Sequence, residues 1–140
     1  MRFLIRQEQP MQWYEREGGM QRLQVEQALV HDLYPRGGFR LELLDDGCAA
    51  WIGYLGPNEH IRNRYAVCIV YPKRYMTGTV PRVDVLAPEI DSGAPHLWSD
   101  GSLCIEHGDF NANDPITEVF GWTVQWLALY EHWQQTGERW

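Results

Sequence analysis

The stretch YPKRYMTGTVPRVDVLAPEIDSGAPHLWSDGSLC, residues 71–104, decides how the rest of this chain is interpreted. It begins at the end of an apolar segment and passes through a proline-bounded turn to a short alternating segment at residues 82–86. A loop rich in Pro and Gly then leads to Cys104, within Gly101-Ser102-Leu103-Cys104-Ile105. We therefore expect the earlier chain to build a platform on which this loop presents Cys104 as a nucleophile.

The segment before the platform has the spacing of a helix at residues 20–34, ended by Pro35 and two glycines. Apolar residues on one face predict which side of this helix is buried. Arg22 and Glu26 are placed away from that face, which consists of Met20, Leu23, Val30 and Leu33.

Four strands are then predicted, at residues 39–43, 48–55, 64–71 and 82–86. Asp45-Asp46-Gly47 is typical of a hairpin turn, because Asp-Gly tolerates the positive φ that tight hairpins need. The third strand is almost entirely apolar and is expected to be central, whereas the fourth alternates and is expected to be more exposed. The fold class is therefore α+β, with one helix followed by a four-stranded antiparallel meander.

After Cys104 the sequence predicts a polar loop at residues 106–113 and a long helix at residues 115–135. Asp114 is expected to be the N-cap and Pro115 the first helical residue, and Gly137 is a plausible C-cap. The face expected to be buried consists of Ile116, Val119, Phe120, Thr123, Trp126, Leu127, Tyr130 and Trp133.

Length and composition predict a single domain over residues 1–140, in which residues 1–19 form an extension of uncertain structure. The formal net charge of −7 argues against a nucleic-acid partner, which would need a basic surface. The sequence contains no apolar stretch long enough to span a membrane, and its start lacks the apolar core of a signal peptide. We expect a cytoplasmic protein that does not bind a membrane, with its three cysteines reduced.

The cysteines differ in context. Cys48 and Cys68 lie within predicted strands and are expected to be small core residues. Cys104 follows a loop, and either His96 or His107 could pair with it as a base, although a single histidine more often only packs or bonds a carbonyl. Cys104 with both histidines gives too few ligands for a structural zinc site. The usual signatures of nucleotide-binding proteins and serine hydrolases are absent.

Four motifs in order resemble those of ubiquitin-conjugating enzymes, over about residues 20–135. Tyr71-Pro72-Lys73-Arg74-Tyr75-Met76 resembles the family's Phe-Pro-x-x-Tyr-Pro, and Val80-Pro81-Arg82-Val83-Asp84-Val85 resembles its Pro-Pro-x-(Val/Ile)-x-Phe strand. Residues 101–105 resemble Gly-x-(Ile/Val)-Cys-Leu, and Asp114-Pro115-Ile116-Thr117 resembles the Ser-Pro-x-x-Thr that opens the next helix. Each motif is weak alone, but their order and spacing together are fairly specific.

Two departures from the family pattern are visible. The family's His-Pro-Asn aligns with Ala94-Pro95-His96, so His96 occupies the position of an Asn that assists the oxyanion. The sequence ends soon after the helix at 115–135, so the family's last two helices are expected to be missing. Tryptophans could cover the surface that those helices would shield, or present it to a partner: Trp122, Trp126, Trp133 and Trp140.

The resemblance is to the short bacterial forms encoded in antiphage operons such as CBASS. It implies that Cys104 forms a thioester with the C-terminal carboxyl group of a cyclic-nucleotide synthase (CD-NTase) or a ubiquitin-like protein and passes it to an amine. His96 would stabilise the oxyanion, a separate activating enzyme or a homodimer is possible, and no metal or cofactor is implied. The chain could instead be a non-catalytic binding module or a Cys-His thiol hydrolase.

Overall fold

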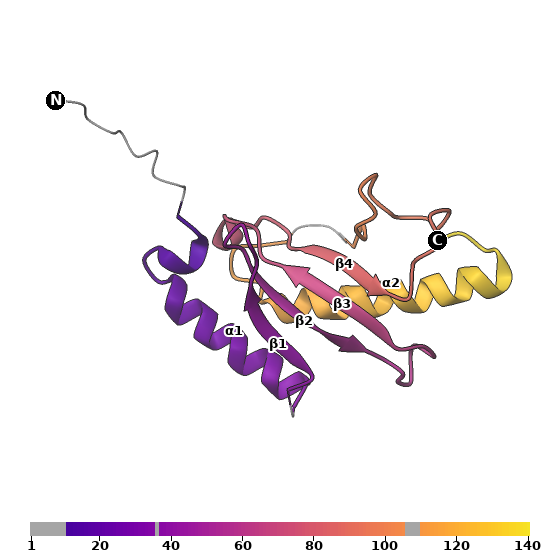
Figure 1. The fold of residues 1–140 in the computed structure, drawn as a ribbon, viewed down its shortest axis with the longest axis horizontal. Coiled ribbons are helices and arrows are strands. Elements are labelled where there is room, and N and C mark those ends of the chain that lie inside the picture. Colours follow the sequence, from indigo (N-terminus) through magenta and orange to yellow (C-terminus); the bar gives the residue numbers. More distant parts are fainter. Residues whose placement is uncertain (1–10, 36, 106–109) are drawn as a thin grey trace.

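The computed structural model describes residues 11–35, 37–105 and 110–140. It confirms an α+β fold in which a helix precedes the sheet and a second helix follows the loop that contains Cys104 (Figure 1). The elements in chain order are η1 (Trp13–Glu15), α1 (Gly19–Leu33), β1 (Phe39–Leu43), β2 (Ala49–Leu55), β3 (Tyr65–Val70), η2 (Tyr75–Thr77), β4 (Arg82–Ala87) and α2 (Ile116–Thr136).

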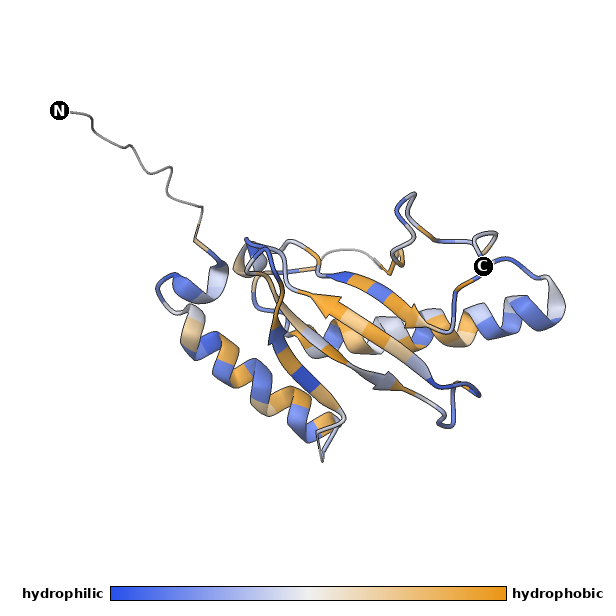
Figure 2. Cartoon of the chain, viewed as in Figure 1, coloured by the Kyte–Doolittle hydropathy of each residue, from blue (hydrophilic) through white to orange (hydrophobic). Residues whose placement is uncertain are grey.

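The sheet is the predicted antiparallel meander, in the order β1-β2-β3-β4. The turn between β1 and β2 closes with Gly47 N–H donating to the Leu44 carbonyl at 2.8 Å, and Gly47 has a φ of 86°. β3 lies between β2 and β4, as its apolar sequence predicts (Figure 2). Alternation at the first and fourth strands, an apolar run at the third and a single Asp-Gly turn were therefore enough to predict the sheet.

Both helices contact the same face of the sheet, which makes the domain a two-layer structure. Trp51 of β2 packs edge-on against His31 of α1, with ring centroids 5.7 Å apart. Phe39 of β1 packs in the same way against Phe120 of α2, at 4.8 Å. The predicted buried face of α2 is confirmed, since seven of its eight residues are buried and Trp133 is half-buried.

The predicted buried face of α1 was partly wrong. Leu23 and Val30 are buried, but Met20 and Leu33 are 51% and 55% exposed. Glu26 was predicted to lie off the buried face, but it is completely buried. Its polar partners come from distant parts of the chain, so the apolar spacing of the helix does not reveal them. A buried carboxylate without such partners would be very costly.

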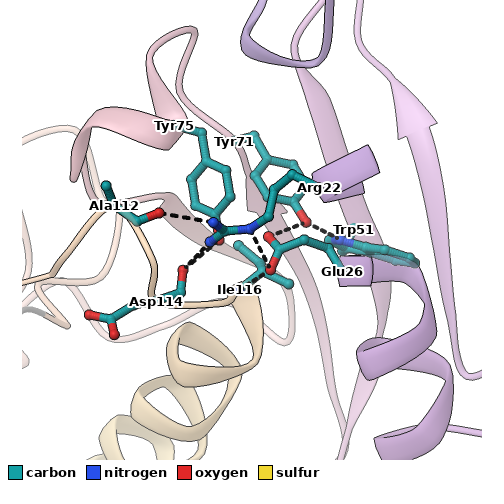
Figure 3. A network of polar contacts seen from close by, with 8 residues as sticks. All are labelled: Arg22, Glu26, Trp51, Tyr71, Tyr75, Ala112, Asp114 and Ile116. Carbon is teal, nitrogen blue, oxygen red and sulfur yellow. Dashed lines mark hydrogen bonds and ion pairs between the residues drawn. The ribbon is translucent and has the colours of Figure 1, made fainter. Parts of the chain in front are cut away.

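Glu26 accepts hydrogen bonds from two distant parts of the chain (Figure 3). The Tyr71 hydroxyl donates to Oε1 at 3.1 Å and the Ile116 backbone N–H donates to Oε2 at 2.9 Å. Tyr71 in turn accepts from the Trp51 indole N–H at 2.9 Å. Burial and the nearby Glu26 carboxylate raise the pKa of Tyr71, which keeps its hydroxyl protonated as a donor.

Arg22 extends this network toward the start of α2. Its Nε lies 3.7 Å from Glu26 Oε2, and its two terminal nitrogens donate to the backbone oxygens of Ala112 and Asp114 at 2.9 and 2.7 Å (Figure 3). The guanidinium also lies 5.3 Å from the ring centroid of Tyr75. One turn of α1 therefore fixes the segment that leads into α2.

The predicted cap of α2 was wrong in its details. Pro115 is the N-cap rather than the first helical residue, and it provides no capping side chain. Asp114 turns its carboxylate back to accept from the Asn111 N–H at 2.8 Å. The first helical amide, that of Ile116, is satisfied by Glu26 instead, so α1 supplies the cap that the local sequence does not. Gly137 is confirmed as the C-cap, with a φ of 74°.

A second buried carboxylate, Glu131 of α2, fixes the loop before β3. It accepts from the backbone amides of Arg62 and Asn63 and from the Tyr65 hydroxyl, at 2.8 to 3.0 Å. Burial raises the pKa of Glu131, but these hydrogen bonds outweigh it and hold the pKa below its ordinary value. Glu131 therefore stays ionised at neutral pH and ties α2 to the sheet.

We predict that Glu26→Gln lowers the free energy of unfolding by about 1–3 kcal/mol, because a glutamine has one acceptor oxygen and its NH₂ group would face a donor. Urea denaturation at pH 7 measures this change. Glu42→Gln is the matched control, since Glu42 forms an exposed ion pair with Arg40. Equal losses in the two variants would show that the Glu26 carboxylate is not the group that holds the helices together.

Candidate active site

Residues 96–104 form a tight hairpin that ends at Cys104. Leu97 and Leu103 pair as an isolated antiparallel bridge. The Trp98 N–H donates to the Ser102 carbonyl, and the Cys104 N–H donates to the His96 carbonyl, both at 2.9 Å. This pattern places His96 directly opposite Cys104. The two sequence-predicted site residues are thus brought together by the hairpin.

The hairpin is fixed to the edge of the sheet. The Leu103 N–H donates to the Val83 carbonyl of β4 at 2.9 Å. At the tip, Asp100 accepts from the amide and the hydroxyl of Ser102 at 3.0 and 2.6 Å, and it pairs with Arg82 at 2.6 Å. The hydrogen bonds from Ser102, and then the Arg82 guanidinium, lower the pKa of Asp100. Cys104 therefore lies on a supported strand-like segment rather than on a free loop.

His96 has an unusual backbone conformation. Its φ of 56° is left-handed, and it is the one non-glycine residue with a positive φ in the described part of the chain. Such conformations are disfavoured for residues with a Cβ, and they cluster at functional sites. The His96 carbonyl accepts from both the Cys104 N–H and the Trp126 indole N–H, at 2.9 and 3.0 Å. These two donors hold the conformation in place.

The three thiols have the environments that the sequence predicts. Cys48 and Cys68 are buried, at 8% exposure each, and Cys104 is half-buried. Burial and the Asp46 carboxylate raise the pKa of the Cys48 thiol. Burial, followed by Asp84, raises the pKa of the Cys68 thiol. Both of these cysteines are therefore poor nucleophiles, and Cys104 is the accessible one.

A pocket lies next to the segment that carries Cys104, but Cys104 itself is not among the residues that line it. A pocket of about 220 Å³ lies along the hairpin and is lined by residues from the turn before β4 and by the neighbours of Cys104: Val80, Pro81, Arg82, Trp98, Ser102, Leu103 and Ile105. Trp98, which lines this pocket, is 55% exposed. The predicted polar loop at residues 106–113 lies partly outside the described residues, as does His107.

The potential metal ligands in this part of the sequence are Cys104, His96 and His107. Within residues 11–35, 37–105 and 110–140, no three His, Cys, Asp or Glu side chains come together in a way that would hold a metal ion. No helix in the same ranges has the length and apolar character needed to cross a membrane.

Two residues that contact His96 were missed from the sequence. Trp126 was predicted only as part of a buried face, and Trp140 only as a covering residue. The Trp140 ring lies 5.5 Å from the His96 ring and 5.5 Å from Trp126, and its backbone oxygen is hydrogen-bonded to His96 Nε2. The position of Trp140 depends on the turn at Gly137, and no local signal in the sequence indicates it.

The order of the elements is that of an E2-like protein: a helix, an antiparallel meander, a cysteine-bearing segment and a second helix. The chain belongs to the family of Type II CBASS E2 proteins, whose family model matches residues 26–140. Its role is therefore E2-like, in CBASS antiphage defence. A comparison with curated proteins gives no match.

We predict that limited iodoacetamide labels Cys104 before Cys48 and Cys68, because alkylation requires an accessible thiolate. Peptide mass spectrometry of the folded protein, sampled over time, measures the order of labelling. Cys104→Ala is the control and should leave only slow labelling under native conditions. Labelling of Cys68 ahead of Cys104 would contradict our assignment of the reactive thiol.

Proposed function

We propose that this protein carries an acyl group on Cys104. The thiolate attacks the activated C-terminal carboxyl group of a partner protein, the activating group leaves, and a thioester forms. An amine, most simply a lysine, then attacks the thioester carbon. A C–N bond forms, the C–S bond breaks, and the proton lost by the amine is taken up so that the Cys104 thiol is regenerated. The thioester divides one difficult acyl transfer into two easier steps.

The pairing of His96 with Cys104 across the hairpin is the observation that carries this proposal. Attack on the thioester creates an oxyanion, which needs a positioned hydrogen-bond donor. The Cys104 backbone amide does not supply it, because this amide already donates to the His96 carbonyl at 2.9 Å. The His96 side chain is exposed and belongs to the residue whose backbone pairs with Cys104, so we assign the oxyanion donor to its imidazole.

The partner is proposed from the family. A CBASS operon contains a cyclic-nucleotide synthase, and some antiphage operons encode a ubiquitin-like protein; either C-terminus is a candidate acyl donor. A free carboxylate does not form a thioester without activation, so we also propose a separate activating enzyme. The half-buried state of Cys104 fits a narrow peptide tail better than a bulky folded surface.

We predict a thiol-sensitive adduct between Cys104 and the last residue of the partner. Co-expression with the neighbouring genes, followed by non-reducing gels and mass spectrometry, would detect it. Cys104→Ala should abolish the adduct. Cys104→Ser is the matched control, because the oxygen ester that it forms should resist thiols.

The two alternatives predict different results. A non-catalytic binding module would retain the partner in pull-downs but form no adduct, even with the activating enzyme present. A Cys-His thiol hydrolase would turn over a generic ester or peptide without a partner. Either result would contradict the transferase proposal.

We predict that His96→Ala slows transfer from a preformed thioester by about 10²–10³-fold, the loss seen when one oxyanion donor is removed. His96→Asn should retain more activity, since an amide also donates and Asn tolerates the left-handed backbone. Transfer rates and melting curves measured together test this. A large fall in melting temperature with unchanged chemistry would make His96 structural.

A further inference from the structure

His96 is held at both its backbone and its side chain by aromatic residues that come from α2 and the segment after it. The indole N–H of Trp126 donates to the His96 carbonyl at 3.0 Å. Trp140 contacts the imidazole ring and accepts a hydrogen bond from it through its backbone oxygen. Among the described residues, only these two tryptophans make a ring contact or an indole hydrogen bond with His96.

The contact from Trp126 acts on the backbone. A left-handed φ is disfavoured for histidine, so the hydrogen-bond pattern around residue 96 must favour it. Trp126 is only 2% exposed and stacks on Tyr130 at 5.3 Å with an interplanar angle of 17°, which fixes the direction of its N–H. Leaving this buried indole N–H without its acceptor would be costly. The hydrogen bond from Trp126 therefore constrains the position of the His96 carbonyl.

The contact from Trp140 acts on the imidazole. A backbone oxygen can only accept, so Nε2 must carry the hydrogen in this contact. Nδ1 has no hydrogen-bond partner among the described residues, so it is the ring nitrogen left to face the oxyanion. To donate to the oxyanion while Nε2 donates to Trp140, the ring must carry a hydrogen on both nitrogens. The Trp140 ring also packs edge-on against Trp126, at 5.5 Å and 80°, so the two contacts reinforce each other.

We propose that Trp126 and Trp140 are positioning residues for His96. They form an aromatic clamp, defined as these two tryptophans, that holds the His96 backbone in its left-handed conformation and directs Nδ1 toward the acyl group on Cys104. The turn at Gly137 brings Trp140 to the hairpin, where the end of the chain lies beside the loop that carries His96 (Figure 1). The role in transfer rests on the proposed function, whereas the structural effect of the clamp on His96 does not.

The decisive variant is Trp126→Phe, which keeps an aromatic ring on Tyr130 and removes the indole N–H. Single-turnover discharge of the preformed Cys104 thioester should slow by about three- to tenfold, the loss expected for one hydrogen bond. In a His96→Ala background the same change should have almost no further effect, because a positioning residue acts only through the residue it positions.

Trp133→Phe is the matched control. It makes the same chemical change further along α2, at an indole that packs on Tyr130 with ring centroids 5.9 Å apart and has no described contact with His96. Its discharge rate should equal that of the wild type. Equal slowing by Trp126→Phe and Trp133→Phe, or an undiminished effect of Trp126→Phe in the His96→Ala background, would overturn the proposal.

Trp140→Ala is a second test of the clamp in case Trp126→Phe does not fold. The fold should tolerate it, because Trp140 is only half-buried and its loss leaves no cavity in the core. It should slow discharge in the wild-type background and not in the His96→Ala background.

A readout independent of activity separates this inference from the proposed function. The imidazole signals of His96, assigned by their absence in His96→Asn, should shift in Trp140→Ala and Trp126→Phe and stay in place in Trp133→Phe. If no thioester forms but these shifts appear, the clamp exists and the transferase proposal fails. Unshifted signals in both clamp variants would show that the clamp does not hold His96.

Discussion

The carboxylate of Glu26 is the interaction on which the rest of the structure depends. It joins the helix before the sheet to Tyr71 at the end of the central strand and to Ile116 at the start of α2. All three groups are buried, so each hydrogen bond replaces a contact with water that the fold has removed. Removing one partner would leave the others unsatisfied, which makes the arrangement specific as well as stabilising.

This constraint extends to the candidate site through the helix that it caps. Because Ile116 is fixed by Glu26, the start and direction of α2 are set relative to the sheet. Trp126 lies ten residues further along α2, which is about 15 Å at the rise of an α-helix. The helix therefore delivers the Trp126 indole N–H to the His96 carbonyl. The hairpin reaches the same point from the other side, through the bond between Leu103 and Val83.

The fold was largely predictable, because its signals are local. Alternating and continuous apolar segments predicted the strands, the Asp-Gly pair predicted the first turn, and the apolar spacing of α2 predicted its buried face. Glu26, the cap of α2 and the position of Trp140 were not predictable, because their partners are remote in sequence. Glu26 also fits the helical spacing of Leu23 and Val30, but an acidic residue is not expected in a buried stripe until its hydrogen-bond donors are known. His96 and Cys104 were proposed as site residues from motif order, and the structure adds that their backbones pair across the hairpin.

The histidine at position 96 can be understood from two requirements that act on one residue. The hairpin and Trp126 impose a left-handed backbone, which among residues with a side chain is best tolerated by Asn, Asp and His. The proposed chemistry requires a hydrogen-bond donor near a developing negative charge, and an ionised Asp accepts and repels rather than donates. Glycine fits the backbone but has no side chain to donate. Asn and His are the residues that satisfy both requirements, so the exchange of one for the other preserves the backbone and replaces an amide donor with an imidazole donor.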